Sequence, residues 1–226
     1  MNADYRINCM IPVILLSDGY IANGSEPWKI PDIDSLPEIE TRLTKKKEGF
    51  APFQHDNPNL SRPWALPGTP GMEHRVGGLE KWEETGHVSY DPENHQKMVE
   101  LRQQKVDVIA NDIALAKAFG KGNGDLLVIG WGGTHGALRS AVETAQEKGM
   151  SVSHLHLRHL NPLPRNLGEI LVKFQKVMIA ELNMGQLAAI IRSKFLVDAV
   201  SLNKIQGKPF TITEVFNKIT ELVKGA

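Results

Sequence analysis

The sequence predicts an α/β fold in which a mostly parallel sheet lies between two layers of helices, a three-layer αβα sandwich. Residues 126–129, 152–157 and 176–180 form short apolar segments of the length expected for buried strands. Segments with apolar residues at helical spacing follow residues 134 and 186. Turns rich in glycine or polar residues come directly after the strands. Strands that alternate with helices favour a parallel sheet covered on both faces.

Residues 125–150 form the clearest unit of this pattern. The strand at 126–129 is followed by four glycines between residues 130 and 136, which allow a tight turn. We expect a helix to begin near Thr134 as its N-cap and to end at Gly149. A second strand at 152–157 then completes a βαβ unit, for which a right-handed crossover is expected.

The glycine turn GWGGTHG has two interpretations. A helix N-terminus behind a glycine loop can bind a phosphate, which makes Gly133 and Thr134 candidate ligand positions. The turn lacks the Lys-Ser/Thr of a P-loop, and its spacing only approximates the dinucleotide fingerprint. The sequence therefore favours the alternative, in which the glycines let the strand and helix pack closely.

Other polar residues lie where predicted strands end, the edge at which open α/β sheets bind ligands. Asp18 and Asn23 follow an apolar segment at 11–17, and Arg158 follows the strand at 152–157. A guanidinium suits a carboxylate or a coenzyme A phosphate, but an interface ion pair would use Arg158 equally well.

Three more candidates follow the strand at 176–180: Glu181, Asn183 and Gln186. They could contact a ligand, or they could hold the turn by hydrogen-bonding backbone N–H groups. We expect interface or turn residues here. No residue of the chain is assigned a catalytic role.

Alternation in the strand at 152–157 places His154 and His156 on one face and Leu155 and Leu157 on the other. Two histidines could ligate a metal ion, but no third ligand has a convincing spacing. We therefore expect half-buried polar side chains near a sheet edge and predict no metal site.

The chain before residue 91 has a different character. The apolar segment at 11–17 predicts a buried strand, so residues 1–30 are interpreted as the terminal strand and loop of another α/β domain. Residues 31–90, rich in proline and glycine turns, predict a linker with short strands or a hairpin. Trp28, Trp64 and Trp82 are expected to anchor it by burial.

Residues 91–226 are predicted to form the compact α/β domain. It would open with a helix over residues 92–117, for which Asp91 is the N-cap and Pro92 the first helical residue. A short helix is expected at 167–174 and a last strand at 199–202. A final helix is expected after Thr213, which is predicted as its N-cap.

Composition excludes several classes of protein. The formal net charge of the 226 residues is zero, which gives no reason to expect nucleic-acid binding. No apolar run approaches the roughly 20 residues of a transmembrane helix, so a cytoplasmic protein is expected. The single cysteine, Cys9, rules out an intrachain disulfide and a cysteine-ligated iron–sulfur cluster, and an inert thiol is expected.

Several long stretches resemble the alpha subunit of 2-oxoacid:ferredoxin oxidoreductases, in particular the 2-oxoglutarate type. They are residues 12–28, 85–105, 126–142, 154–164 and 181–210. The resemblance implies that residues 91–226 form a domain like the transketolase C-terminal domain. It also implies that residues 1–30 end a truncated pyrimidine-type thiamine domain.

The resemblance further implies a function at the level of an assembly. Such enzymes convert a 2-oxoacid, coenzyme A and oxidised ferredoxin into an acyl-CoA, CO₂ and reduced ferredoxin. Thiamine diphosphate, magnesium and an iron–sulfur cluster belong to the complete enzyme, and none is expected on this chain alone. A beta subunit is the expected partner in an oligomer, with this chain as a scaffold and assembly domain that is inactive alone. The alternative is a free-standing nucleotide- or phosphate-binding module, or a protein-interaction module.

Overall fold

A computed structural model describes residues 9–36, 38, 41, 43–45, 47–55 and 58–225. The chain divides into two compact units. One comprises Met1–Leu15 with Trp28–Asp112, and the other comprises Leu16–Pro27 with Ile113–Ala226. This division places residues 91–112 with the segment before them, whereas the sequence grouped them with the α/β domain. The assignment of residues 1–30 to a separate thiamine domain stays a prediction.

The second unit is built on a four-stranded sheet with strand order β2-β1-β3-β4. The strands are β1 (Gly124–Trp131), β2 (Val152–Leu157), β3 (Phe174–Glu181) and β4 (Val200–Asn203). All three pairings are parallel, with Leu126 opposite Val152 and Met178 opposite Val200. The predicted parallel sheet is confirmed, as are its four expected strands.

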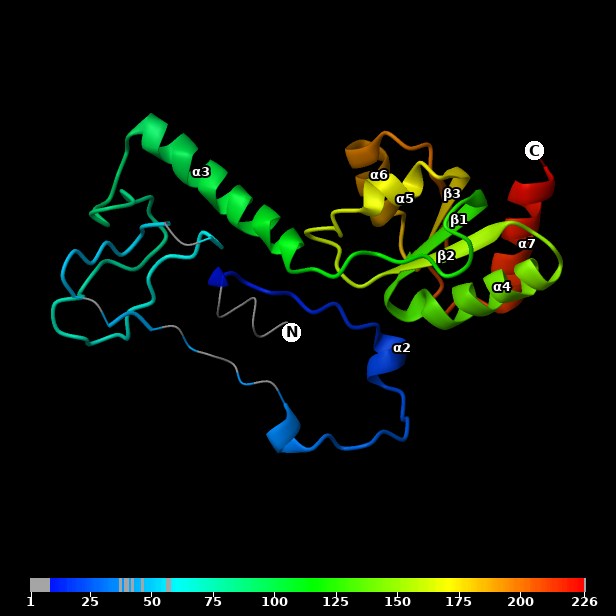
Figure 1. Ribbon diagram of the computed structural model, residues 1–226, viewed down its shortest axis with the longest axis horizontal. Helices are drawn as coiled ribbons and strands as arrows, with labels where there is room; N and C mark the ends of the chain where they lie inside the picture. Colours follow the sequence, from blue (N-terminus) through cyan, green and yellow to red (C-terminus); the bar gives the residue numbers. More distant parts are fainter. Residues whose placement is uncertain are drawn as a thin grey trace. The chain divides into compact units, whose positions relative to one another are not determined.

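Helices cover both faces of this sheet (Figure 1). On one face, α4 (His135–Glu147) and α7 (Ile212–Lys224) pack on β1 and β3 through a buried cluster. On the other face, α5 (Leu167–Leu171) and α6 (Gln186–Phe195) pack on β1, β2 and β3. The three-layer αβα sandwich is therefore confirmed.

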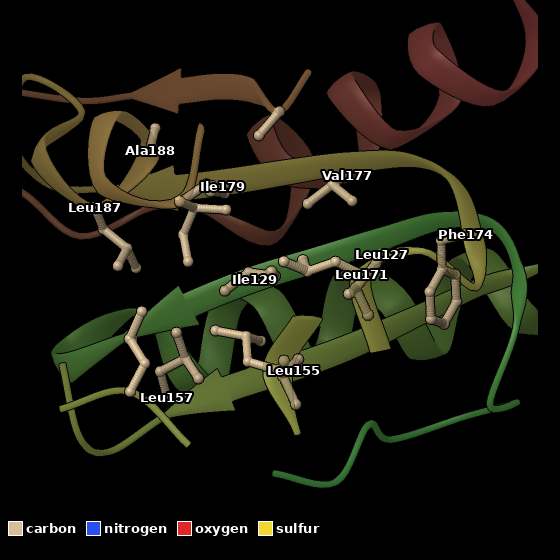
Figure 2. Packing of buried hydrophobic residues seen from close by; sticks show 14 residues of the cluster. Leu127, Ile129, Leu155, Leu157, Leu171, Phe174, Val177, Ile179, Leu187 and Ala188 are labelled. Carbon is tan, nitrogen blue, oxygen red and sulfur yellow. The ribbon is translucent and has the colours of Figure 1, made fainter. Parts of the chain in front are cut away.

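Figure 2 shows the second of these clusters, in which aliphatic side chains from alternate positions of the strands meet those of α5 and α6. Leu127 and Ile129 of β1 point toward this cluster and are fully buried. Burial at successive positions is expected for a strand that helices cover on both faces. Further members are Leu155, Leu157, Leu171, Phe174, Val177, Ile179, Leu187 and Ala188.

Several predicted helix ends are corrected. Thr134 does not cap α4 through its side chain, because the hydroxyl donates to Trp131 O (2.8 Å) within a 3-10 turn, η3 (Gly132–Thr134). The N-cap of the final helix lies two residues before Thr213. Thr211 is its N-cap, and a reciprocal capping box with Glu214 fixes the start there. The glycine predicted at the end of α4, Gly149, does adopt a left-handed φ of +80°.

The strand predicted at residues 11–17 is wrong: within this part of the described chain the backbone pairs with no strand. Ile14, Leu15 and Leu16 are 81%, 74% and 58% exposed. A short helix, α2 (Gly19–Ala22), follows, with Asp18 as its N-cap. An apolar segment becomes a buried strand only when neighbouring strands supply its hydrogen bonds, and the described chain supplies none here.

The first unit contains η1 (Ile33–Ser35), α3 (Pro92–Asp107) and η2 (Val108–Asn111). Asp91 caps α3 as predicted, accepting from Asn94 N (2.7 Å), but the helix ends ten residues before the predicted residue 117. Lys81 and Val88 form an isolated antiparallel bridge, and the linker with short strands or a hairpin stays a prediction. Cys9 is buried beside Lys105 and Asp112, and burial raises the pKa of its thiol, as expected for an inert cysteine.

Tryptophan does not anchor the segment before α3. Trp28 is 74% exposed and Trp82 is 44% exposed, and Trp64 is only half-buried. Phe53 in this segment contacts two cations, with the Arg62 guanidinium 5.1 Å and the Lys81 ammonium 5.3 Å from its ring centroid.

None of the helices in the described part of the chain has both the length and the apolar character that a membrane crossing requires.

Candidate functional site

The polar residues singled out in the sequence gather at the carboxyl edge of the sheet, where β1, β2 and β3 end at Trp131, Leu157 and Glu181. These strands are neighbours and parallel, so their ends lie on the same side. Two turns at this edge are filled by carboxylates of the chain itself, one after β1 and one after β3.

The turn after β1 is occupied by Asp18, which lies in the same structural unit. A Cβ added at Gly133 would collide with the Asp18 carboxylate, and it would lie 3.3 Å from the Cβ of Asp18. The other carboxylate oxygen of Asp18 accepts from Tyr20 N (3.1 Å). The Asp18 carboxylate therefore lies directly against Gly133, so the turn has no room for a side chain at this position and the negative charge disfavours a phosphate nearby.

Gly130, at the end of β1, supports the same interpretation. A Cβ there would collide with the side chains of Leu138 and Thr134, so the absence of a side chain lets α4 lie directly on the strand. Gly132 follows with a φ of +58°, a left-handed conformation that favours glycine. These contacts favour the packing interpretation of GWGGTHG over a phosphate cradle.

The turn after β3 is organised by Glu181, which has no exposed surface. Its carboxylate accepts hydrogen bonds from Leu187 N (3.0 Å) and Ala188 N (3.0 Å) in the first turn of α6. It also accepts from Trp131 Nε1 (3.2 Å) and Asn183 Nδ2 (3.1 Å). A carboxylate at a helix N-terminus is favoured by the free N–H groups and the helix dipole.

Asn183 completes this turn, because its Oδ1 accepts from Gly185 N (2.8 Å). Gln186, the first residue of α6, is exposed. Asn23 caps α2 by donating from Nδ2 to Gly19 O (2.8 Å), and Arg158 is exposed after β2. The structure thus gives Asn23, Glu181 and Asn183 turn-forming contacts. A ligand role for Arg158 or Gln186 stays a prediction.

A histidine cluster lies on the opposite side of β2 from the leucines, as the alternation predicted. His154 is 2% exposed and His156 is half-buried. His135, the first residue of α4, joins them, with ring centroids 5.6 Å from His154 and 4.9 Å from His156. Sequence reasoning missed His135, because no periodicity links the start of a helix to the strand after it.

Neither strand histidine is charged at neutral pH. Burial, together with neighbouring His156, His135 and Arg139, lowers the pKa of His154 to about 3. Burial, His135 and Arg158 lower the pKa of His156 to about 4. Within the described residues no three His, Cys, Asp or Glu side chains are arranged to hold a metal ion, the histidine cluster included.

Comparison with known proteins shows which proteins this chain is similar to. Residues 124–215 match the family described as pyruvate:ferredoxin oxidoreductase core domain II. The chain is 48% identical over 215 residues to the 2-oxoglutarate oxidoreductase subunit KorA of Mycobacterium tuberculosis, covering 95% of the chain and 33% of that protein. It is 29% identical over 226 residues to the alpha subunit of 2-oxoacid:ferredoxin oxidoreductase 1 of Aeropyrum pernix, covering 95% and 34%.

A solved structure agrees. The chain superposes with a TM-score of 0.78 and 27% identity on the 2-oxoglutarate:ferredoxin oxidoreductase of Magnetococcus marinus, a structure with 2-oxoglutarate, coenzyme A and succinyl-CoA bound. The match covers 85% of this chain and 34% of that one. The chain is therefore related to alpha subunits of 2-oxoacid:ferredoxin oxidoreductases, which confirms the resemblance found in the sequence. It spans about one third of the length of the curated relatives described above.

The contact between Gly133 and Asp18 predicts a specific double-mutant result. Gly133→Ala should lower the free energy of unfolding by about 1–2 kcal/mol, because the new methyl group displaces the Asp18 carboxylate. Asp18→Ala removes the colliding atoms, so the double variant should recover most of the loss. Urea denaturation gives the free energies of unfolding of the unmodified chain, the two single variants and the double variant.

Gly136→Ala is the matched control, since a Cβ there meets no atom within 4 Å and alanine favours the helix. Additive losses in the double variant would show that Asp18 does not occupy the turn.

The Glu181 network predicts a larger effect. Glu181→Gln should lower the free energy of unfolding by about 2–3 kcal/mol, because an amide NH₂ faces donors that then lack an acceptor. Urea denaturation followed by circular dichroism measures the free energy of unfolding. Glu147→Gln, at an exposed position of α4, should change stability by less than about 0.5 kcal/mol. Equal effects of the two substitutions would contradict the network.

Proposed function

We propose that this chain is part of the alpha subunit of a thiamine-dependent 2-oxoglutarate:ferredoxin oxidoreductase, which makes succinyl-CoA, CO₂ and reduced ferredoxin. The observation that carries the proposal is the 48% identity to the M. tuberculosis 2-oxoglutarate oxidoreductase subunit along 95% of the chain. The match to a structure with 2-oxoglutarate, coenzyme A and succinyl-CoA bound supports the same substrate class.

Within that enzyme, the role we propose is scaffolding and assembly. Thiamine diphosphate supplies the electron sink for decarboxylation in this chemistry. The described residues do not fit its diphosphate and metal ion, because Asp18 fills the glycine turn and no metal-holding group is present among them. We therefore derive no catalytic step from this chain, and we place the cofactor, magnesium and the iron–sulfur cluster elsewhere in the assembly.

The surface of the chain supports an assembly role. Residues 14–36 expose a series of large apolar side chains along the sequence, and exposed apolar surface is a mark of protein-interaction sites. They are Ile14, Leu15, Leu16, Tyr20, Ile21, Trp28, Ile30, Ile33 and Leu36, each more than half exposed. We propose that the other parts of the enzyme, the thiamine domain and a beta subunit, cover this segment.

Reconstitution tests the proposal. The chain alone should release no CO₂ from 2-oxoglutarate, whereas its complex with the remaining alpha-subunit domains and the beta subunit should reduce ferredoxin when 2-oxoglutarate and coenzyme A are supplied. Ile14→Asp and Ile30→Asp should each weaken assembly by about 10-fold or more, because burying one isoleucine contributes about 1.5–3 kcal/mol.

Val172→Asp is the control, a 77% exposed apolar residue outside the segment, and it should leave assembly unchanged. Turnover by the isolated chain, or assembly that is indifferent to both isoleucine substitutions, would overturn the proposed role.

The phosphate-binding alternative has less support, because it needs a free glycine turn and the structure fills that turn with Asp18.

A further inference from the structure

The proposed function does not use the histidine cluster. His154 and His156 project from the same face of β2, with ring centroids 6.0 Å apart. His135 approaches both from the first turn of α4. Three imidazoles thus lie between a strand at the edge of the sheet and the start of the helix that covers it.

The two strand histidines are incompletely hydrogen-bonded. In the described part of the chain, His154 Nε2 and His156 Nδ1 are buried and have no hydrogen-bond partner. A neutral imidazole tolerates one unpaired nitrogen at a modest cost, whereas an imidazolium buried without an acceptor is strongly disfavoured.

The charges around the cluster do not favour an imidazolium either. From α4 come His135 and Arg139; the guanidinium of Arg139 pairs with Glu143 and lies 3.0 Å from the Phe119 ring centroid. Arg158 follows β2. No carboxylate raises the pKa of His154 or His156, and the residues opposite them on β1 are Val128 and Gly130.

One further segment contacts the cluster. Phe119 pairs with His154 through two backbone hydrogen bonds, Phe119 N to His154 O (2.7 Å) and His154 N to Phe119 O (2.9 Å). These bonds cover part of the free edge of β2. Asp18, in the segment that packs on the neighbouring turn, lies against Gly133.

We propose that the cluster of His135, His154 and His156 makes this edge of the domain an acid-sensitive latch, which opens more often in mildly acidic solution than at neutral pH. In the open state β2 separates from the start of α4, the pairing with Phe119 is broken, and the exposed strand histidines take up protons. Because His135 directly follows η3, opening also loosens the turn on which Asp18 packs.

The lowered pKa values determine in which direction pH changes the stability of the closed state. A histidine whose pKa falls from 6.5 to about 3 or 4 on folding stabilises the closed state fully above pH 6.5, and this contribution is lost as the pH falls below that value. For each histidine that becomes exposed on opening, the equilibrium constant for opening is about 30-fold larger at pH 5 than at pH 7.5.

Hydrogen exchange of the full chain at pH 7.5 and 5.0 tests the proposal. After correction for the intrinsic exchange rate, the amides of Phe119 and of β2 should open about 30-fold more often or more at pH 5.0. Those of β3, at the centre of the sheet, should change much less. Equal protection of β2 at the two pH values would overturn the proposal.

Three variants locate the effect. His154→Leu should reduce the acid response of β2 by about 30-fold. His156→Gln, at a half-buried position, gives the same test if the first variant fails to fold. His87→Gln, an exposed histidine outside the cluster, should keep the full response. An unchanged response in the folded cluster variants would overturn the latch.

Discussion

The second unit depends most on the hydrogen bonds that the carboxylate of Glu181 accepts. It has no exposed surface and accepts from two backbone N–H groups of α6, the Trp131 indole and Asn183. Burying a carboxylate is costly unless hydrogen bonds replace its water, and four donors do so here. One side chain at the end of β3 thereby fixes the end of β1 and the start of α6.

Asp18 plays a comparable part at the neighbouring turn, where its carboxylate occupies the space beside Gly133. Open α/β sheets commonly bind ligands at the edge where these two turns lie. Here both turns are filled by carboxylates that belong to the chain. These carboxylates disfavour a bound phosphate at this edge, which is consistent with the assembly role that we propose for the chain.

Hydrophobic patterning was sufficient to predict the four strands, the covering helices and the face that His154 shares with His156, because burial imposes a period on each element separately. Patterning was insufficient where an outcome depends on a partner distant in sequence. The apolar segment at 11–17 has no strand beside it in the described chain, and the tryptophans lack the packing that would bury them. The contacts of Asp18 with Gly133, and of His135 with the β2 histidines, likewise exist only once the chain is folded.

Calorimetric titration of the chain with coenzyme A tests most directly the claim that its own carboxylates close the carboxyl edge. We expect no saturable heat from the unmodified chain at coenzyme A concentrations up to about 1 mM, a dissociation constant that corresponds to about 4 kcal/mol of binding free energy. Saturable, salt-sensitive binding that is lost on Gly133→Val would contradict it. That result would make the glycine turn a phosphate site and favour a free-standing binding module.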